Sequence, residues 1–105
     1  LTPPIMKFNI ERGDQRTIEK YCNIAKALGK GVSKNDKDNA LKSTEAVEEI
    51  ADFIGLKRKL TDCGVTHDAI EKMADISLDL GMGAISCNPV MPSREDKIKI
   101  YEESL

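Results

Sequence analysis

The residues best suited to catalysis or metal binding are few: one histidine, His67, and three cysteines, Cys22, Cys63 and Cys87. A zinc or iron site needs three or four converging His, Cys, Asp or Glu side chains. The cysteines are 41 and 24 residues apart, so neither a CxxC pair nor a disulfide framework can be read from them. His67 stands where a helix is expected to begin, and we expect it to face solvent. The sequence therefore predicts no catalytic residue and no metal ligand in this chain.

The three cysteines fall in different surroundings. Cys22 lies on an apolar helical stripe, which favours a small core residue over a reactive thiol. Cys63 lies in a turn, and its role stays open. Cys87 lies in the uncharged segment 84–89, which follows Gly83 and could approach a ligand without electrostatic obstruction. The Gly-x-Gly at 81–83 has no strand before it and no third glycine after it, so we expect no dinucleotide site.

Charge and composition exclude two further classes. Sixteen Lys and Arg against 18 Asp and Glu give a net charge of -2, which offers no basic field for nucleic acid. The longest uncharged stretch, 80–93, contains two Gly and two Pro and cannot form a membrane-spanning helix. No signal peptide is visible, so we expect a cytoplasmic location. The first residue is Leu rather than Met, which favours a piece of a longer polypeptide.

Hydrophobic periodicity predicts an all-α fold, a small bundle of about four to five helices forming a single domain over residues 1–105. Asp14 and Gly29 bound the first helix, and the second runs over 38–54 before Gly55, with a later start at Ser43 as an alternative. The third helix follows Thr66 and stops at the glycines 81 and 83. The fourth follows a Ser-x-x-Asp capping box at 93–96. The segment 5–9 is apolar but too short to predict an element of its own.

Four segments, taken in order, resemble motifs of one enzyme family. Residues 1–9, LTPPIMKFN, are similar to Leu-Pro-x-Val-Met-x-Phe-Asn, and 24–29, IAKALG, to Ala-x-Ala-Leu-Gly. Residues 54–65 resemble Leu-Gly-Ile-Pro followed by Leu-x-x-x-Gly-Val. The segment 88–101 is similar to Asn-Pro-Arg-x-x-Ser/Thr-x-Glu-Asp-x-x-x-x-Tyr. Together these segments resemble the C-terminal part of the iron-containing (group III) alcohol dehydrogenases.

The resemblance implies the C-terminal part of a helical domain of the dehydroquinate synthase-like type, belonging to a larger two-domain enzyme. In such enzymes an α/β domain binds NAD or NADP, while one Asp and three His hold Fe(II) or zinc, which polarises the alcohol oxygen during hydride transfer. The first motif follows closely on the last of those histidines. The resemblance thus implies that this segment binds no cofactor or metal and lacks dehydrogenase activity alone. It also places Ser86, Cys87 and Asn88 near the substrate pocket of the intact enzyme.

An alternative is a stand-alone helical module for protein interactions, without catalysis. The two hypotheses differ in their expected surface. A dehydrogenase segment has the remainder of its parent enzyme as partner, and alone it should expose an apolar face, with Ile5, Met6, Phe8 and Met82 as candidates. Such a face could also form a homo-oligomer. An evolved module should be a clean monomer or part of a defined complex.

Overall fold

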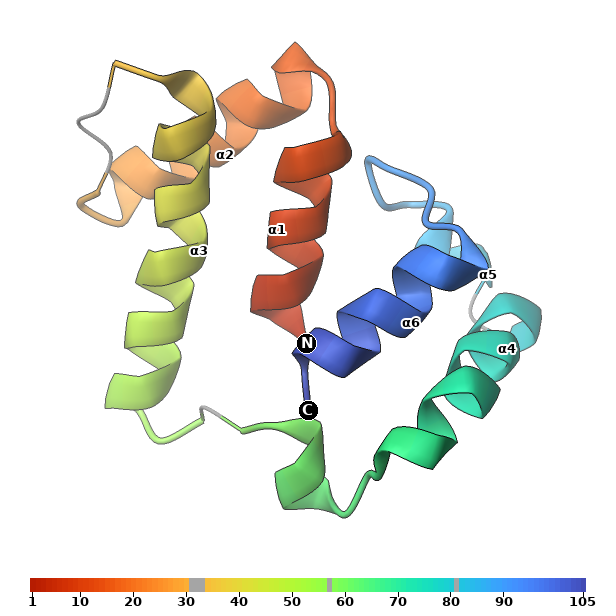
Figure 1. The fold of residues 1–105 in the computed structure, drawn as a ribbon. Helices are drawn as coiled ribbons and strands as arrows, with labels where there is room; N and C mark the ends of the chain where they lie inside the picture. The colour runs from red at the N-terminus through yellow and green to blue at the C-terminus, as the bar shows by residue number, and fades with distance from the viewer. Residues whose placement is uncertain (31–33, 57, 81) are drawn as a thin grey trace. The chain divides into compact units, whose positions relative to one another are not determined.

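The computed structural model of the chain describes residues 1–30, 34–56, 58–80 and 82–105, apart from the side chains of 78–80 and 82. The described residues form helices, with no strand among them, which confirms the predicted all-α class (Figure 1). They divide into two compact units: an N-terminal unit of residues 2–57, and a C-terminal unit of Leu1 with residues 58–105. Within the described ranges, no helix is long and apolar enough to cross a membrane.

The N-terminal unit begins with a helix that the sequence analysis missed. Helix α1 spans Thr2–Arg12 and buries Met6, Phe8, Asn9 and Ile10. Pro3 and Pro4 fit in its first turn, because the amide hydrogens that proline lacks have no intrahelical acceptor there. The expectation that Met6 and Phe8 are exposed is therefore wrong, since each is 8% exposed, whereas Ile5 is exposed as expected. The side chain of Met82 lies outside the described part of the structure.

Helix α2, Gln15–Ala27, confirms both predicted boundaries. The Asp14 carboxylate accepts a hydrogen bond from the Thr17 backbone N–H at 2.9 Å, which caps the first turn. At the other end Gly29 has a φ of +80°, and the Lys30 N–H donates to the Ala25 carbonyl at 2.8 Å. This is a Schellman end, in which the left-handed conformation favours glycine.

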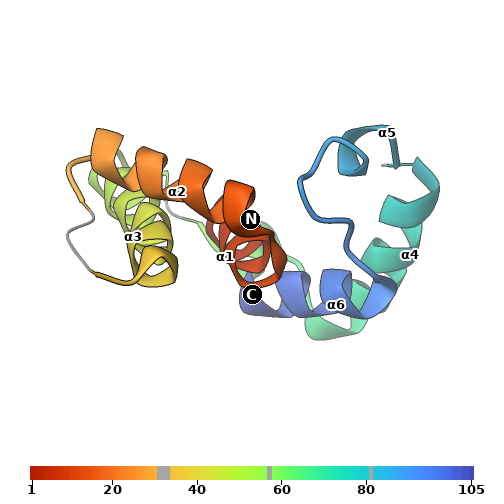
Figure 2. The same ribbon diagram turned by 90° about the horizontal axis from the view of Figure 1, so that it is seen from above.

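Helix α3 spans Asp36–Phe53 and packs against both α1 and α2 (Figures 1 and 2). It begins earlier than predicted because the Asn35 side chain accepts from the Lys37 N–H at 2.9 Å and so caps the helix. The alternative start at Ser43 is wrong, since Ser43 is fully buried in the middle of the helix. The buried face carries small residues, namely Ala40, Ser43, Thr44 and Ala46.

In the C-terminal unit two short 3₁₀ turns, Leu60–Cys63 and His67–Ala69, precede α4, Ile70–Leu80. A further turn of helix, α5, spans Met82–Ile85, so the prediction that Gly83 stops the helix is wrong. The predicted stop at Gly81 lies outside the described residues. Helix α6, Arg94–Glu103, packs on α4 and buries Ile70 and Ala74 in the unit's core. The end of the chain is fixed by the Leu60 N–H, which donates to the Ser104 carbonyl at 2.8 Å.

Candidate functional site

The segment 83–93, which runs from within α5 to the start of α6, carries the three residues placed near a substrate pocket by resemblance. Ser86 and Cys87 are exposed and Asn88 is half-buried. Their backbone continues the turn of α5, because the N–H groups of Cys87 and Asn88 donate to the carbonyls of Ala84 and Ile85 at 3.1 and 3.0 Å. These three consecutive residues therefore lie on the short loop that follows α5.

The side chains of this loop bond to its own backbone. The Ser86 hydroxyl donates to the Gly83 carbonyl at 2.8 Å, and the Cys87 thiol lies 3.5 Å from the same oxygen. The Asn88 side-chain amide donates to the Val90 carbonyl at 2.6 Å and closes the turn before Pro92. In these contacts the hydroxyl and the thiol donate to a backbone carbonyl, which is not a base that could activate them as nucleophiles. The loop can thus present polar and apolar contacts to a ligand, and nothing in these bonds prepares covalent chemistry.

Helix α6 anchors the end of the loop. Ser93 caps the helix by accepting from the Asp96 N–H at 3.1 Å, while the Asp96 carboxylate accepts from the Ser93 N–H at 3.0 Å. This confirms the predicted capping box. The Arg94 guanidinium then reaches α4 and contacts Asp75 with both Nε, at 2.6 Å, and Nη2, at 3.3 Å. This bidentate pair joins α6, which follows the loop, to α4, which precedes α5.

The Asp75–Arg94 pair was missed by the sequence analysis. The two residues are 19 positions apart, so no helical spacing links them, and each looks like an ordinary surface charge. The hydrogen bond from Arg94 lowers the pKa of Asp75 below its usual 3.8, and the same bond raises the pKa of Arg94. The pair acts as a clamp between α4 and α6.

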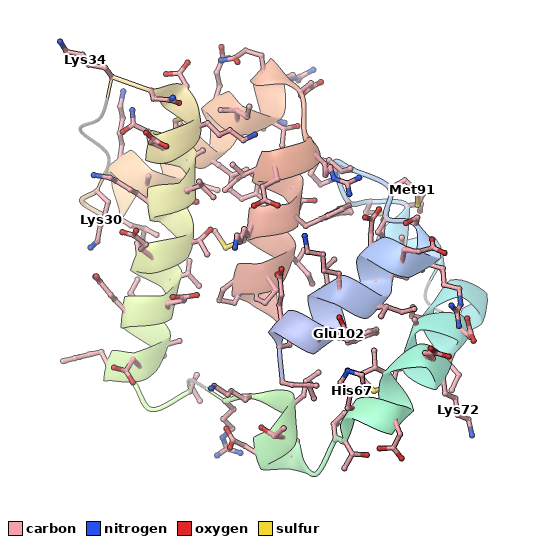
Figure 3. All side chains as sticks on the ribbon, viewed as in Figure 1. Lys30, Lys34, His67, Lys72, Met91 and Glu102 are labelled. Atoms are coloured by element: carbon pink, nitrogen blue, oxygen red, sulfur yellow. The ribbon has the colours of Figure 1, made fainter. Side chains whose placement is uncertain are left out.

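The other candidate residues lie apart from the loop residues in sequence and in contacts. His67 is exposed, as predicted, and its Nε2 lies 3.4 Å from Oε1 of Glu102 (Figure 3). Cys63 is exposed in the first 3₁₀ turn. Cys22 is half-buried rather than a core residue, and its thiol donates to the Asp36 carbonyl at 3.1 Å. Burial, together with the charge of Asp36, raises the pKa of Cys22, which disfavours the reactive thiolate.

No group of three His, Cys, Asp or Glu side chains that could hold a metal ion occurs among the residues that the structure describes. His67 lies beside the carboxylate of Glu102 and next to Asp68 in sequence, but the described residues around it form no group of three donors such as iron or zinc needs. The described side chains therefore do not form a metal site by themselves. No step of a metal-assisted reaction can be assigned to them.

Comparison with known proteins gives a match along the entire chain. The sequence profile described as "Fe-containing alcohol dehydrogenase family, C-terminal" matches residues 1–105. A search of curated proteins finds no match.

Two solved structures are similar to the chain, and both are of ADH/D1, an archaeal halo-thermophilic alcohol dehydrogenase from a Red Sea brine pool. A point mutant of it is 32% identical, with a TM-score of 0.88. The form bound to NZQ is 34% identical, with a TM-score of 0.86. Each comparison covers 99% of this chain and 26% of the other, so the chain spans about a quarter of the length of that enzyme. The chain belongs to the Fe-containing alcohol dehydrogenase family, of which it represents the C-terminal helical part.

Proposed function

We propose that this chain acts as the C-terminal helical part of an iron-dependent, NAD(P)-linked alcohol dehydrogenase, which transfers hydride between an alcohol and the corresponding aldehyde. The observation that carries the proposal is the agreement of sequence and fold over the same residues: a family match along 1–105 and a TM-score of 0.88 over 99% of the chain. Nothing in the comparisons supports the alternative of a stand-alone interaction module.

The cofactors belong to the rest of the enzyme in this proposal. Fe(II) or zinc would supply Lewis-acid polarisation of the alcohol oxygen, and NAD or NADP would accept the hydride. Their binding residues are expected in the part of the polypeptide that the relatives possess beyond the matched quarter. The 105 residues then supply packing for that part and bind neither group themselves.

The loop at 83–93 is the part of this chain that we place beside the substrate. Support comes from the exposure of Ser86 and Cys87, and from the anchoring of the loop's end by the Ser93 cap and the Asp75–Arg94 clamp. Small, uncharged side chains on an anchored turn suit contacts with the carbon chain of an alcohol. In this role Ser86, Cys87 and Asn88 shape the pocket and take no part in proton or hydride transfer.

The remaining partners follow from the same proposal. The main partner is the remainder of the parent enzyme, and a homo-oligomer formed through an exposed apolar face is a second. We place the enzyme in the cytoplasm, and we expect it to bind neither nucleic acid nor membrane.

The test starts with the mass of the intact protein in its source cells. The proposal expects a species of roughly 40 kDa, the size of an enzyme with domains of ordinary length. The purified protein should reduce NAD or NADP with a primary alcohol, lose this activity on chelation, and regain it with Fe(II) or zinc. Cys87→Ala should change KM for the alcohol, whereas Cys63→Ala should leave it unchanged. A native product of 11.6 kDa without activity would contradict the proposal and favour the interaction module.

A further inference from the structure

The segment 83–93, which we call the substrate loop, holds its shape through contacts between near neighbours in sequence. The side-chain contacts of Ser86, Cys87 and Asn88 described above span three, four and two residues. Such short contacts shape a turn, but they do not fix its position relative to the helices of the C-terminal unit. That position depends on how the elements before and after the loop are joined.

Arg94, the first residue of α6, joins the end of the substrate loop to α4. Its guanidinium contacts the Asp75 carboxylate with Nε at 2.6 Å and Nη2 at 3.3 Å, and Nη2 also lies 3.8 Å from Oε2 of Glu71. Glu71 and Asp75 are four residues apart on α4, so both carboxylates lie on one side of that helix. A bidentate contact fixes direction as well as distance. The clamp thus closes the span of 19 positions from Asp75 to Arg94, and the whole substrate loop lies within that span.

We propose that Asp75 and Arg94 are positioning residues, which set the affinity for the alcohol by holding the substrate loop in its binding position. The inference rests on the proposed function. Asp75 and Arg94 both belong to the C-terminal unit, in which α4 packs on α6, so the clamp is a property of that unit alone (Figure 1). Neither residue touches the substrate or moves a proton or hydride in this role.

A positioning role predicts a specific kinetic change. If only a fraction of the molecules hold the loop in its binding position, the apparent dissociation constant of the alcohol rises by the inverse of that fraction. Saturating alcohol selects the competent molecules, so KM should rise while kcat stays unchanged. The side chains of Arg94 and Asp75 are 40% and 55% exposed, and an exposed charge pair can supply a change of about two- to fivefold. A merely structural role predicts the reverse, because partial unfolding lowers kcat and leaves KM unchanged.

The experiment measures KM and kcat for ethanol, butanol and hexanol, using the intact protein loaded with Fe(II) and saturated with NAD or NADP. Arg94→Gln should raise KM about two- to fivefold at constant kcat. Asp75→Asn should raise KM less, because Glu71 still lies beside the guanidinium. The double variant should match Arg94→Gln alone, since both substitutions remove the same contact. Glu102→Gln is the matched control, because it alters a contact with His67 in the same unit and should change neither constant.

An unchanged KM for Arg94→Gln, or a lower kcat at unchanged KM, would overturn the inference. Effects that multiply in the double variant would also overturn it, since one shared contact cannot be lost twice. A rise of KM in Glu102→Gln as large as that in Arg94→Gln would overturn it as well. Alcohol oxidation by the parent protein tests the proposed function separately. An active parent with any of these results refutes the positioning role alone, whereas a parent that oxidises none of the alcohols refutes the proposed function and leaves no substrate to position.

Discussion

The corner between α1 and α2 leaves no room for a side chain at Gly13. Its N–H donates to the Asn9 carbonyl at 2.7 Å, which continues the hydrogen bonding of α1 for one more residue. A β-carbon added to Gly13 would meet the same carbonyl oxygen, together with Cγ2 and Cβ of Thr17 at 2.7 and 2.9 Å. All three contacts are closer than real β-carbons tolerate. Gly13→Ala should therefore force α1 and α2 apart.

The loss of stability caused by Gly13→Ala can be estimated from the atoms involved. The Thr17 side chain is buried and lies in the capped first turn of α2, and the Asn9 oxygen belongs to the backbone, so neither can move alone. Overpacking at such sites destabilises a protein by about 1–3 kcal/mol. At about 4–8 °C for each kcal/mol in a domain of this size, the loss should be plain in a thermal scan. Urea unfolding of the 105-residue chain, followed by circular dichroism, gives the free energy directly.

Two further variants sharpen the result. Gly83→Ala is the matched control, because a β-carbon there meets nothing within 4 Å and the backbone is helical, so its stability should stay equal or rise slightly. Gly13→Ala combined with Thr17→Ser removes Cγ2 and should recover only part of the loss, since the Asn9 oxygen remains. A Gly13→Ala protein within about 0.5 kcal/mol of the parent would refute the reasoning.

Two predictions concern charged groups of the C-terminal unit. Lys97 is 5% exposed, and its Nζ has no hydrogen-bond partner among the described residues. Lys97→Met should therefore raise the free energy of unfolding by about 1–3 kcal/mol. Lys99→Met, at an exposed position, is the control and should change the free energy of unfolding little. The hydrogen bond from Arg94 lowers the pKa of Asp75 in the folded protein below its unfolded value of 3.8. The pair therefore stabilises the fold fully above pH 3.8, and this stabilisation is lost as the pH falls through the lower pKa of the folded state. Asp75→Asn should therefore reduce stability at neutral pH but not in acid. Urea unfolding at several pH values measures this, with Glu103→Gln as the control. A loss of stability that does not depend on pH would contradict the prediction.

Several helix ends could be predicted from the sequence because a helix end depends on neighbouring residues. Asp14 before α2 and Ser93 before α6 cap the helices that they were predicted to cap. Gly29 and Gly55 end their helices with positive φ, a conformation that other residues rarely adopt. Helix α1 was missed because its two prolines and short apolar run carry little periodic signal. The helix is stabilised by its packing against α2 and α3, which the sequence does not reveal.

The candidate site was readable only in part. Ser86, Cys87 and Asn88 were singled out by resemblance, and these consecutive residues follow α5 in the structure. The clamp between Asp75 and Arg94 was invisible, since it depends on how α4 packs on α6. The role of the loop beside a substrate stays a prediction.

The sequence by itself determined the helical class, both ends of α2, the end of α3, the start of α6 and the family, because caps, glycine stops and short motifs are properties of adjacent residues. Tertiary structure decided which faces are covered. Ile50 and Ile54 have the spacing of core residues, yet they are exposed where α2 ends, while Met6 and Phe8 were expected on the surface and are buried. Burial depends on which element lies opposite a side chain, and periodicity along one helix carries no information about that element.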